Sequence, residues 1–287
     1  MAKLQTTALA LILFLFSSCE KKEEMATFTG FAMTIPYQVK VGDPTNSWQK
    51  KKIERIIACE FAKINKSSNH WNPHSRLSQF HEGKIDRPEE LEELFALVAE
   101  VKEISEGRFA PEKGAEIQLW KGHLENKTVP STLELKEARE KVYYDLDGIV
   151  KGYAVDCLAK ALENEGFSSL YIEWGGEIFV KGGHPAGRPW KIAAGTRILE
   201  VADCALATSG DSIQRWDDKT HIFSPELGAM ISCKKTIRNV TVQAKSCAVA
   251  DAVATAAMIY DNRDELNEFI KRAKERFEGI YVYDDLL

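Results

Sequence analysis

The chain has 287 residues, of which 44% are hydrophobic and 28% are charged, and its formal net charge is −5. These values are typical of a globular protein with a sizeable core, and they exclude an intrinsically disordered or fibrous chain. A mildly acidic chain without a long run of Lys and Arg is also not expected to bind nucleic acid.

The N-terminal residues form a segment of their own. An apolar run at residues 8–16 follows Lys3, which is the only charged residue before it. The run is too short to span a bilayer and is typical of the hydrophobic core of a secretory signal. Ser17 and Ser18 then precede Cys19, as in a bacterial lipobox, where the cysteine is lipidated. The alternative is an ordinary signal peptide with an incidental cysteine.

This interpretation divides the chain into three parts. We expect a lipoprotein signal peptide at residues 1–18, a lipid-anchored tether at 19–27 and one folded domain at 28–287. The lipid on Cys19 would hold the domain on the extracytoplasmic (periplasmic) face of a bacterial cell membrane.

Strand-like and helix-like stretches alternate through the domain. Alternating apolar residues, Met33 among them, predict one extended stretch at residues 31–41. Apolar stripes at helical spacing predict the helices, and Pro88 and Ser246 mark two of their starts. The expected helices are 48–64, 88–104, 154–162 with an end near 166, 246–260 and 263–277. The other expected strands are 169–174, 177–181, 190–194, 236–243 and 279–283. The pattern indicates a single α+β unit with antiparallel strands, in one or two lobes.

A turn rich in Gly and Asp at residues 144–154 leads directly into the third expected helix. Amide groups at a helix N-terminus, with Lys151 nearby, are able to bind a phosphate. The carboxylates of Asp145 and Asp147 beside them could recruit a cation. Asp-Gly turns before helices are also common without any ligand, so the turn alone leaves a purely structural role open.

A second group of oxygen ligands lies in the alanine-rich helix. Asp251 and Thr255 are four residues apart, so they share one helix face, and their neighbours are small and apolar. A carboxylate and a hydroxyl are the hard ligands that Mg²⁺ prefers. In the alternative interpretation, the helix dipole stabilises Asp251 and Thr255 bonds back to a backbone carbonyl.

Two weaker signals complete the pattern. Glycines at residues 174–177 and 207–211 indicate bulges or close approach of the backbone to a ligand. His221 precedes a proline turn and could contact a phosphate or move a proton, although most single histidines do neither. No GxGxxG or Walker motif is present, so neither standard nucleotide-binding fold is indicated.

In this order and spacing, the segments resemble the ApbE family of FAD:protein FMN transferases. The match covers nearly all of residues 28–260 and depends on seven motifs, each weak alone but specific jointly. The motifs are Ala32-Met33-Thr34-Ile35-Pro36-Tyr37, residues 71–80, residues 145–156, residues 175–178 followed by Gly187-Arg188-Pro189-Trp190, residues 208–211, the His-Ile-x-x-Pro element at His221, and residues 250–255.

The resemblance implies an ApbE-like (T-fold-like) α+β fold, with mixed, largely antiparallel sheets packed with helices. It also implies Mg²⁺-dependent transfer of FMN from FAD to a Thr or Ser hydroxyl of an acceptor protein, with release of AMP. The acceptor would belong to an exported or membrane redox system.

The resemblance further implies roles for individual residues. The metal ligands would be Asp251, Thr255 and the backbone carbonyl of Gly148. Asp251 and His221 would be the catalytic residues. The residues in contact with FAD would be Met33, Trp71, Phe109, Asp145, Lys151 and His221.

Four departures from the family pattern leave alternatives open. The glycine of the first motif is absent, Ala110 and Ser224 stand where the family carries Asp, and Trp174 stands where a small residue is common. The alternative functions are a Mg²⁺-dependent FAD pyrophosphatase, which gives FMN and AMP, and a non-enzymatic FAD-binding lipoprotein.

Overall fold

The computed structural model describes residues 25–210, 215–234 and 237–286. Cys19, with the expected signal peptide, and Asp211 lie outside these ranges. Within them, no helix has both the length and the apolar character needed to cross a bilayer.

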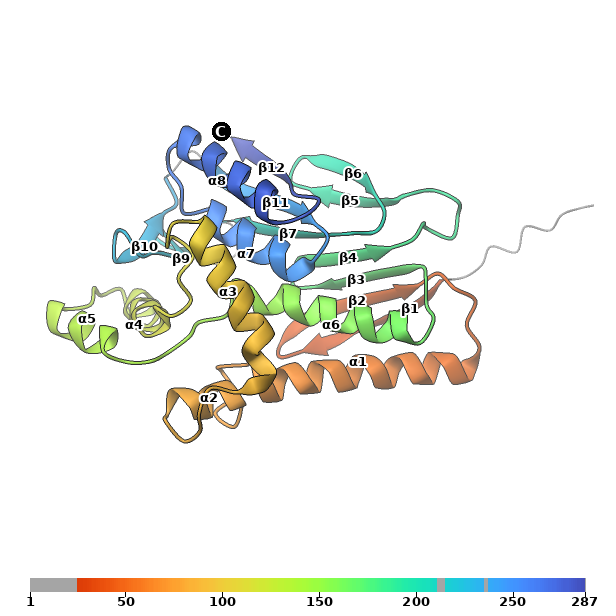
Figure 1. Ribbon diagram of the computed structural model, residues 1–287, viewed down its shortest axis with the longest axis horizontal. Coiled ribbons are helices and arrows are strands. Elements are labelled where there is room, and N and C mark those ends of the chain that lie inside the picture. Colours follow the sequence, from red (N-terminus) through yellow and green to blue (C-terminus); the bar gives the residue numbers. More distant parts are fainter. Residues whose placement is uncertain (1–24, 211–214, 235–236, 287) are drawn as a thin grey trace, which may run out of the picture.

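A seven-stranded sheet organises the molecule (Figure 1). Every strand pair in it is antiparallel. In spatial order its strands are β1 (Ala26–Ala32), β2 (Ile35–Val41), β3 (Leu170–Trp174), β4 (Glu177–Lys181), β7 (Cys204–Gly210), β11 (Ile237–Ala244) and β12 (Tyr281–Leu286). Two small antiparallel sheets flank it. Their strands are β5 (Trp190–Ala194) and β6 (Arg197–Val201), and β8 (Arg215–Trp216), β9 (Lys219–Ser224) and β10 (Ala229–Ser232).

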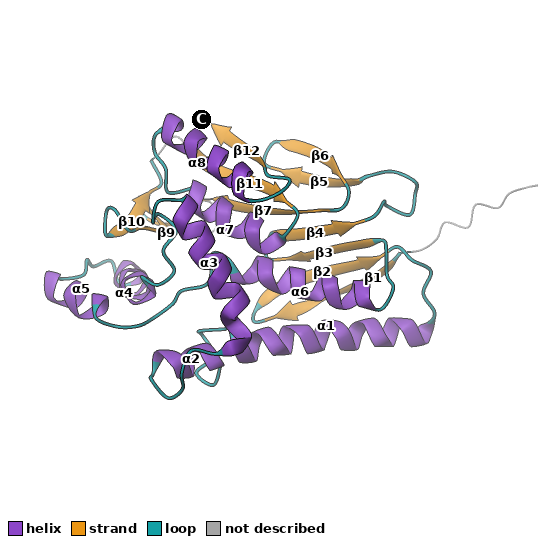
Figure 2. Cartoon of the chain, in the orientation of Figure 1, coloured by secondary structure: helices purple, strands orange, loops and turns teal. Residues whose placement is uncertain are grey.

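Helices cover one face of the large sheet, and shorter helices gather at one end of it (Figure 2). The covering helices are α1 (Ser47–Ser67), α3 (Glu92–Ile104), α6 (Val150–Asn164), α7 (Cys247–Ala257) and α8 (Arg263–Arg276). The elements at the end are α2 (Arg76–His81), the 3₁₀ turn η1 (Glu89–Leu91), α4 (Gly114–Glu125) and α5 (Thr132–Arg139). This arrangement is the α+β architecture expected from the sequence.

Helix α7 lies at the centre of the larger core. Every residue of α7 is buried except Thr255, which is half-buried. The helix begins where expected, because the Ser246 side chain accepts a hydrogen bond from the backbone N–H of Val249. Its small side chains allow the backbones of neighbouring elements to approach closely, so α7 packs against β7, β11 and α6 together.

The closest of these approaches is the crossing of α6 over the start of α7. A Cβ atom placed on Gly152 would lie 2.3 Å from the carbonyl oxygen of Cys247 and 2.8 Å from the Cα of Ala248. One turn further along α6, the Asp156 carboxylate accepts hydrogen bonds from the Ser246 hydroxyl (2.7 Å) and from the Cys247 and Ala248 amides (2.8 and 2.9 Å). A side chain of α6 therefore caps the N-terminus of α7 and fixes the two helices relative to each other.

The prediction of a single strand over residues 31–41 is wrong. Met33 and Thr34 form a two-residue turn with φ angles of 47° and 69°, and Ala32 pairs with Ile35 across it. Left-handed φ at both positions is usually marked by Asn-Gly or Asp-Gly, and neither is present. A two-residue turn also preserves the period of two, so the apolar alternation continues through it without a visible break.

The C-terminal end of α2 supports the segment that leads into α6. The ring of His81 stacks on Tyr143 with centroids 4.0 Å apart, and its Nε2 accepts a hydrogen bond from the Tyr144 amide (2.9 Å). Burial, with a smaller effect from His70, lowers the pKa of His81 to about 4. His81 is therefore neutral at pH 7, as the hydrogen bond to Nε2 requires.

We predict that Gly152→Ala destabilises the protein by about 1–3 kcal/mol, because the new methyl group meets backbone atoms that cannot move independently. The measurement is urea unfolding followed by circular dichroism. Gly122→Ala in α4 is the matched control, since a Cβ there has no neighbour within 4 Å. The control should be stabilised by up to about 1 kcal/mol through helix propensity. Equal effects of the two substitutions would contradict the tight crossing.

We also predict that His81 makes the protein less stable in acid. Its folded-state pKa of about 4 lies below the ordinary value of 6.5. The stabilising effect of the neutral ring is therefore complete above about pH 6.5 and is lost as the pH falls toward 4. Because the ring is only partly buried, we expect a loss of about 1 kcal/mol.

The test compares urea unfolding of the parent and of His81→Gln at pH 7 and pH 4.5. Gln keeps an acceptor oxygen but does not titrate, so its stability should fall less between the two pH values. An identical fall in the two proteins would show that His81 does not carry this pH dependence.

Candidate active site

The turn at the start of α6 meets the C-terminal half of α7. A Cβ atom placed on Gly148 would lie 2.9 Å from Cγ2 and 3.1 Å from Oγ1 of Thr255. The Thr255 hydroxyl also forms a hydrogen bond with the hydroxyl of Ser209 in β7 (3.2 Å). Glycine at position 148 therefore lets the turn approach the Thr255 hydroxyl, and the family resemblance implies that both residues are metal ligands.

Asp251 lies one helical turn before Thr255 and is buried, with 2% of its surface exposed. Its Oδ2 accepts a hydrogen bond from the Gly152 amide (3.1 Å) and lies 3.6 Å from Nζ of Lys151. The Lys151 ammonium also donates to Oε1 of Glu177 (2.9 Å) and to the backbone oxygen of Asp147 (3.4 Å). One half-buried cation thus lies between two buried carboxyl groups.

This group keeps its charges balanced by holding a proton. Burial raises the pKa of Asp251 and raises that of Glu177 to about 8, although Lys151 opposes both shifts. Burial alone would lower the pKa of Lys151, but the Asp251 and Glu177 carboxylates outweigh it and raise that pKa. Oε2 of Glu177 has no hydrogen-bond partner among the described residues. At pH 7 Glu177 is therefore mostly protonated, and a bound cation would take the place of this proton.

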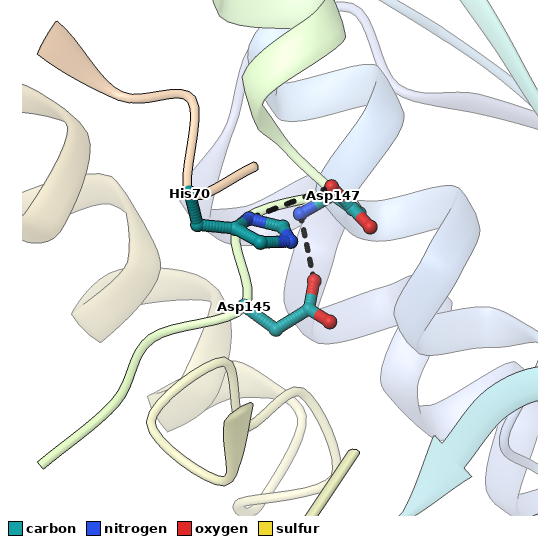
Figure 3. Close-up of side chains that lie close together, drawn as sticks. All are labelled: His70, Asp145 and Asp147. Atoms are coloured by element: carbon teal, nitrogen blue, oxygen red, sulfur yellow. Dashed lines mark hydrogen bonds and ion pairs between the residues drawn. The ribbon is translucent and has the colours of Figure 1, made fainter. Parts of the chain in front are cut away.

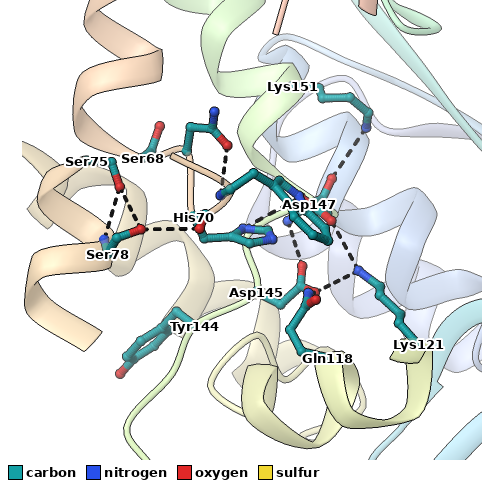
Figure 4. Close-up of polar contacts among 12 residues, drawn as sticks. Ser68, His70, Ser75, Ser78, Gln118, Lys121, Tyr144, Asp145, Asp147 and Lys151 are labelled. Atoms are coloured by element: carbon teal, nitrogen blue, oxygen red, sulfur yellow. Dashed lines mark hydrogen bonds and ion pairs between the residues drawn. The ribbon is translucent and has the colours of Figure 1, made fainter. Parts of the chain in front are cut away.

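A second polar group adjoins the first through the same turn (Figure 4). Asp145 is buried and accepts hydrogen bonds from Gln118 Nε2 (2.8 Å), Lys121 Nζ (2.9 Å) and the Asp147 amide (3.0 Å). Lys121 also lies 3.2 Å from Oδ2 of Asp147. Burial alone would raise the pKa of Asp145, but the Lys121 ammonium outweighs it and keeps that pKa below its usual value. Asp145 is therefore ionised.

The structure brings together four of the residues expected at the site, namely Gly148, Lys151, Asp251 and Thr255. Asp145 joins them through its hydrogen bond with the Asp147 amide.

The other expected residues lie around this group. The turn that holds Met33 lies near this group of residues. A Cβ atom placed on Gly175 would lie 3.0 Å from Cγ2 of Ile35, the first residue after the turn, and 3.4 Å from Cδ of Lys151. Trp71 is 65% exposed and follows His70, whose Nδ1 lies 3.8 Å from Oδ1 of Asp147.

Phe109 and His221 lie on other elements. Phe109 is buried in the larger core with residues of α3, and two residues later the carbonyl of Pro111 accepts a hydrogen bond from the Asp145 amide (2.8 Å). His221 is half-buried within β9 of the three-stranded sheet. The cluster of Trp120, Phe223 and Met230 packs this sheet against α4, which also carries Lys121.

Several residues of the site were not assigned a role from the sequence. Gln118 and Lys121 lie three residues apart on α4, a spacing that places both on one helix face. That signal is usable only once α4 is recognised as a helix, and α4 was not predicted. Glu177 was noticed only as part of a glycine-rich element, and His70 had no signal of its own.

Comparisons with known proteins give one consistent result. The ApbE family model matches residues 33–281. The FAD:protein FMN transferase of Chlamydia pneumoniae is 36% identical, and the alignment covers 96% of each chain. The Vibrio cholerae protein of the same name is 28% identical over 86% of this chain and 85% of that one.

Solved structures agree in fold. Flavin transferase ApbE from Vibrio cholerae superposes with a TM-score of 0.74 at 24% identity, covering 92% of this chain and 94% of that one. Pseudomonas stutzeri flavinyl transferase ApbE gives 0.77 at 24% identity, with 92% of each chain covered. The fold and the family expected from the ordered motifs are thereby confirmed, and the chain belongs to the ApbE family.

Proposed function

We propose that this protein transfers FMN from FAD to a Thr or Ser hydroxyl of an acceptor protein and releases AMP, with Mg²⁺ held by Asp251, Thr255 and the carbonyl of Gly148. The observation that carries the proposal is the meeting of Asp251 and Thr255 with the phosphate-binding type of turn at the start of α6. The Chlamydia pneumoniae relative, which matches along nearly the whole chain, carries the same activity in its name.

The chemistry is a displacement at phosphorus. The acceptor oxygen forms a bond to the phosphorus next to the FMN half, the bond from that phosphorus to the bridging oxygen breaks, and AMP leaves with this oxygen. The acceptor loses its hydroxyl proton, which we assign to His221 as the general base. Bound Mg²⁺ would supply charge compensation for the pyrophosphate.

The residues at the site fit this ion. Mg²⁺ keeps few protein ligands and typically binds through one or two carboxylates together with substrate phosphates. Asp251 supplies the carboxylate and Thr255 a neutral oxygen, and Gly148 has no Cβ to separate its backbone from Thr255. A cation at this place would replace the proton on Glu177, whose pKa burial raises to about 8.

The remaining expected residues would contact FAD. Lys151 places an ammonium beside the metal ligands, where it attracts the pyrophosphate. Trp71 offers an exposed indole for stacking on a flavin or adenine ring. We assign the other dinucleotide contacts to Met33, Phe109 and Asp145.

Water in place of the acceptor hydroxyl would give the FAD pyrophosphatase reaction. Ala110 and Ser224, which stand where the family carries Asp, are the observations that favour this second candidate. Incubation of the protein with FAD, Mg²⁺ and a candidate acceptor separates the two. Transfer adds the mass of FMN to the acceptor as AMP appears, whereas hydrolysis gives AMP and free FMN.

We also propose that the protein acts at a membrane surface. Residues 1–18 would direct export, and a lipid on Cys19 would hold the enzyme on the extracytoplasmic (periplasmic) face through the 19–27 tether. The acceptor would then belong to an exported or membrane redox system.

Our prediction for the metal site is that Asp251→Asn lowers AMP release by at least about 100-fold at millimolar Mg²⁺. Only the carboxylate offsets metal charge, and charge stabilisation of this kind is worth several kcal/mol. Thr255→Ala should lose less and should be partly rescued by higher Mg²⁺. Mn²⁺ binding by electron paramagnetic resonance is measured on the same samples.

Glu116→Gln is the matched control for loss of a buried carboxylate. Glu116 is 3% exposed and pairs with Arg139 at 2.8 Å, in α4. We expect this variant to lose stability but to keep full activity per folded molecule. An Asp251→Asn protein that is destabilised and still fully active would eliminate the metal site.

For the anchor, Cys19→Ala should abolish lipidation and release the protein from the membrane fraction. Cys59→Ala, which removes an exposed cysteine of α1, should leave fractionation unchanged. Immunoblots of soluble and membrane fractions, with metabolic labelling by a palmitate analogue, provide the measurement. Complete retention of the Cys19→Ala protein in membranes would mean that another element anchors it.

A further inference from the structure

His70 is a buried histidine with an unused ring nitrogen. Its side chain is 2% exposed, and its Nε2 has no hydrogen-bond partner among the described residues. Figure 3 shows the imidazole directed toward Asp145 and Asp147. A buried polar atom without a partner is unfavourable, so the arrangement calls for a group that the ring nitrogen can bind.

The ring is held in this orientation from several sides. The backbone oxygen of His70 accepts a hydrogen bond from the Ser78 hydroxyl (3.2 Å), which is itself hydrogen-bonded to Ser75 (3.0 Å). Trp71 and Tyr143 flank the ring, with centroids 4.9 and 6.1 Å away. An imidazole fixed by its surroundings in this way has little freedom to turn toward another partner.

His70, Asp145 and Asp147 together supply a ligand set for a cation. One ring nitrogen and one oxygen of each carboxylate all lie within 4.8 Å of one another, and His70 Nδ1 lies 3.8 Å from Asp147 Oδ1. A borderline cation accepts imidazole, whereas Mg²⁺ prefers oxygen ligands alone. We propose that these three residues bind a divalent transition-metal ion, at a site separate from Asp251 and Thr255.

Lys121 occupies the neighbourhood of this site in the metal-free protein. Its Nζ lies 2.9 Å from Oδ2 of Asp145 and 3.2 Å from Oδ2 of Asp147, so one ammonium faces two carboxylates. One negative charge of the pair therefore remains uncompensated. The Lys121 ammonium pairs with the Oδ2 atoms of both carboxylates, so it repels a metal ion bound between these carboxylates and His70 and acts as its competitor.

The inference does not depend on FAD or on turnover. The two sites share no ligand, although Asp147 and Gly148 are adjacent in the chain. The test titrates Co²⁺ into the chelator-treated protein, without FAD or Mg²⁺, and follows the visible d–d absorption that an imidazole-ligated Co²⁺ ion gives. We expect one Co²⁺ ion per protein to give this imidazole-dependent absorption.

Substitutions of the ligands provide the decisive comparison. His70→Ala and Asp147→Asn should each weaken Co²⁺ binding about tenfold or more, since even outer-shell losses have effects of this size. Lys121→Met should tighten binding, because the competing ammonium is gone. Asp251→Asn should leave the spectrum unchanged.

His123→Gln is the matched control for an unrelated histidine, because His123 lies beside a carboxylate, 3.3 Å from Glu134. It should not alter Co²⁺ binding. Circular dichroism checks folding; if His70→Ala does not fold, Asp147→Asn decides the matter, since the Asp147 side chain is 44% exposed. Co²⁺ absorption and affinity that survive Asp147→Asn, or that disappear in His123→Gln, would overturn the proposal.

Discussion

The crossing of α6 and α7 is the constraint on which the site depends. Asp156 of α6 binds the free amides and the capping serine at the start of α7, and Gly152 removes the side chain that would separate the two backbones. The Gly152 amide can then donate to Asp251 in the next turn of α7. Two helices from distant parts of the sequence are therefore held together by hydrogen bonds. As a result, the turn before α6 lies beside Thr255 of α7.

The electrostatics of the site repeat one pattern. Lys151 lies between Asp251 and Glu177, and Lys121 lies between Asp145 and Asp147. In each group an ammonium lies between two carboxyl groups. Burial raises the pKa of Glu177 to about 8, so a proton balances the second carboxyl of the Lys151 group, whereas one negative charge remains in the Lys121 group. Burying an unbalanced charge is unfavourable, and proteins tolerate it mainly where a ligand supplies the missing charge. These two groups are the positions at which we propose cations, and an anionic dinucleotide would approach once they are filled.

The sequence predicted the parts of the fold whose signals are local. The apolar stripes of α1, α3 and α8 and the serine cap of α7 were visible in short windows, and strands β4 and β5 have the predicted bounds. Asp251 and Thr255 were found because residues four apart on a helix lie on the same face. Helix α4 escaped prediction because it contains two glycines and buries only three of its positions, Gly114, Glu116 and Trp120. Its contribution to the site, Lys121, could not be found without it, and His70 depends on contacts between residues far apart in the chain.

Strand β1 separates the start of the folded domain from the site. It is an edge strand that begins at Ala26 and runs for seven residues to the turn that holds Met33. Ile35, which follows this turn, lies near Gly175, as does Lys151 of the site. At about 3.4 Å per residue, the strand is a rigid spacer of roughly 23 Å between the start of the domain and the site. Figure 1 shows these two points at opposite ends of the strand. With the proposed anchor at Cys19, the catalytic groups would stand at least that length from the tether attachment. The acceptor hydroxyl would then have to reach a point that far from the lipid-anchored start of the domain.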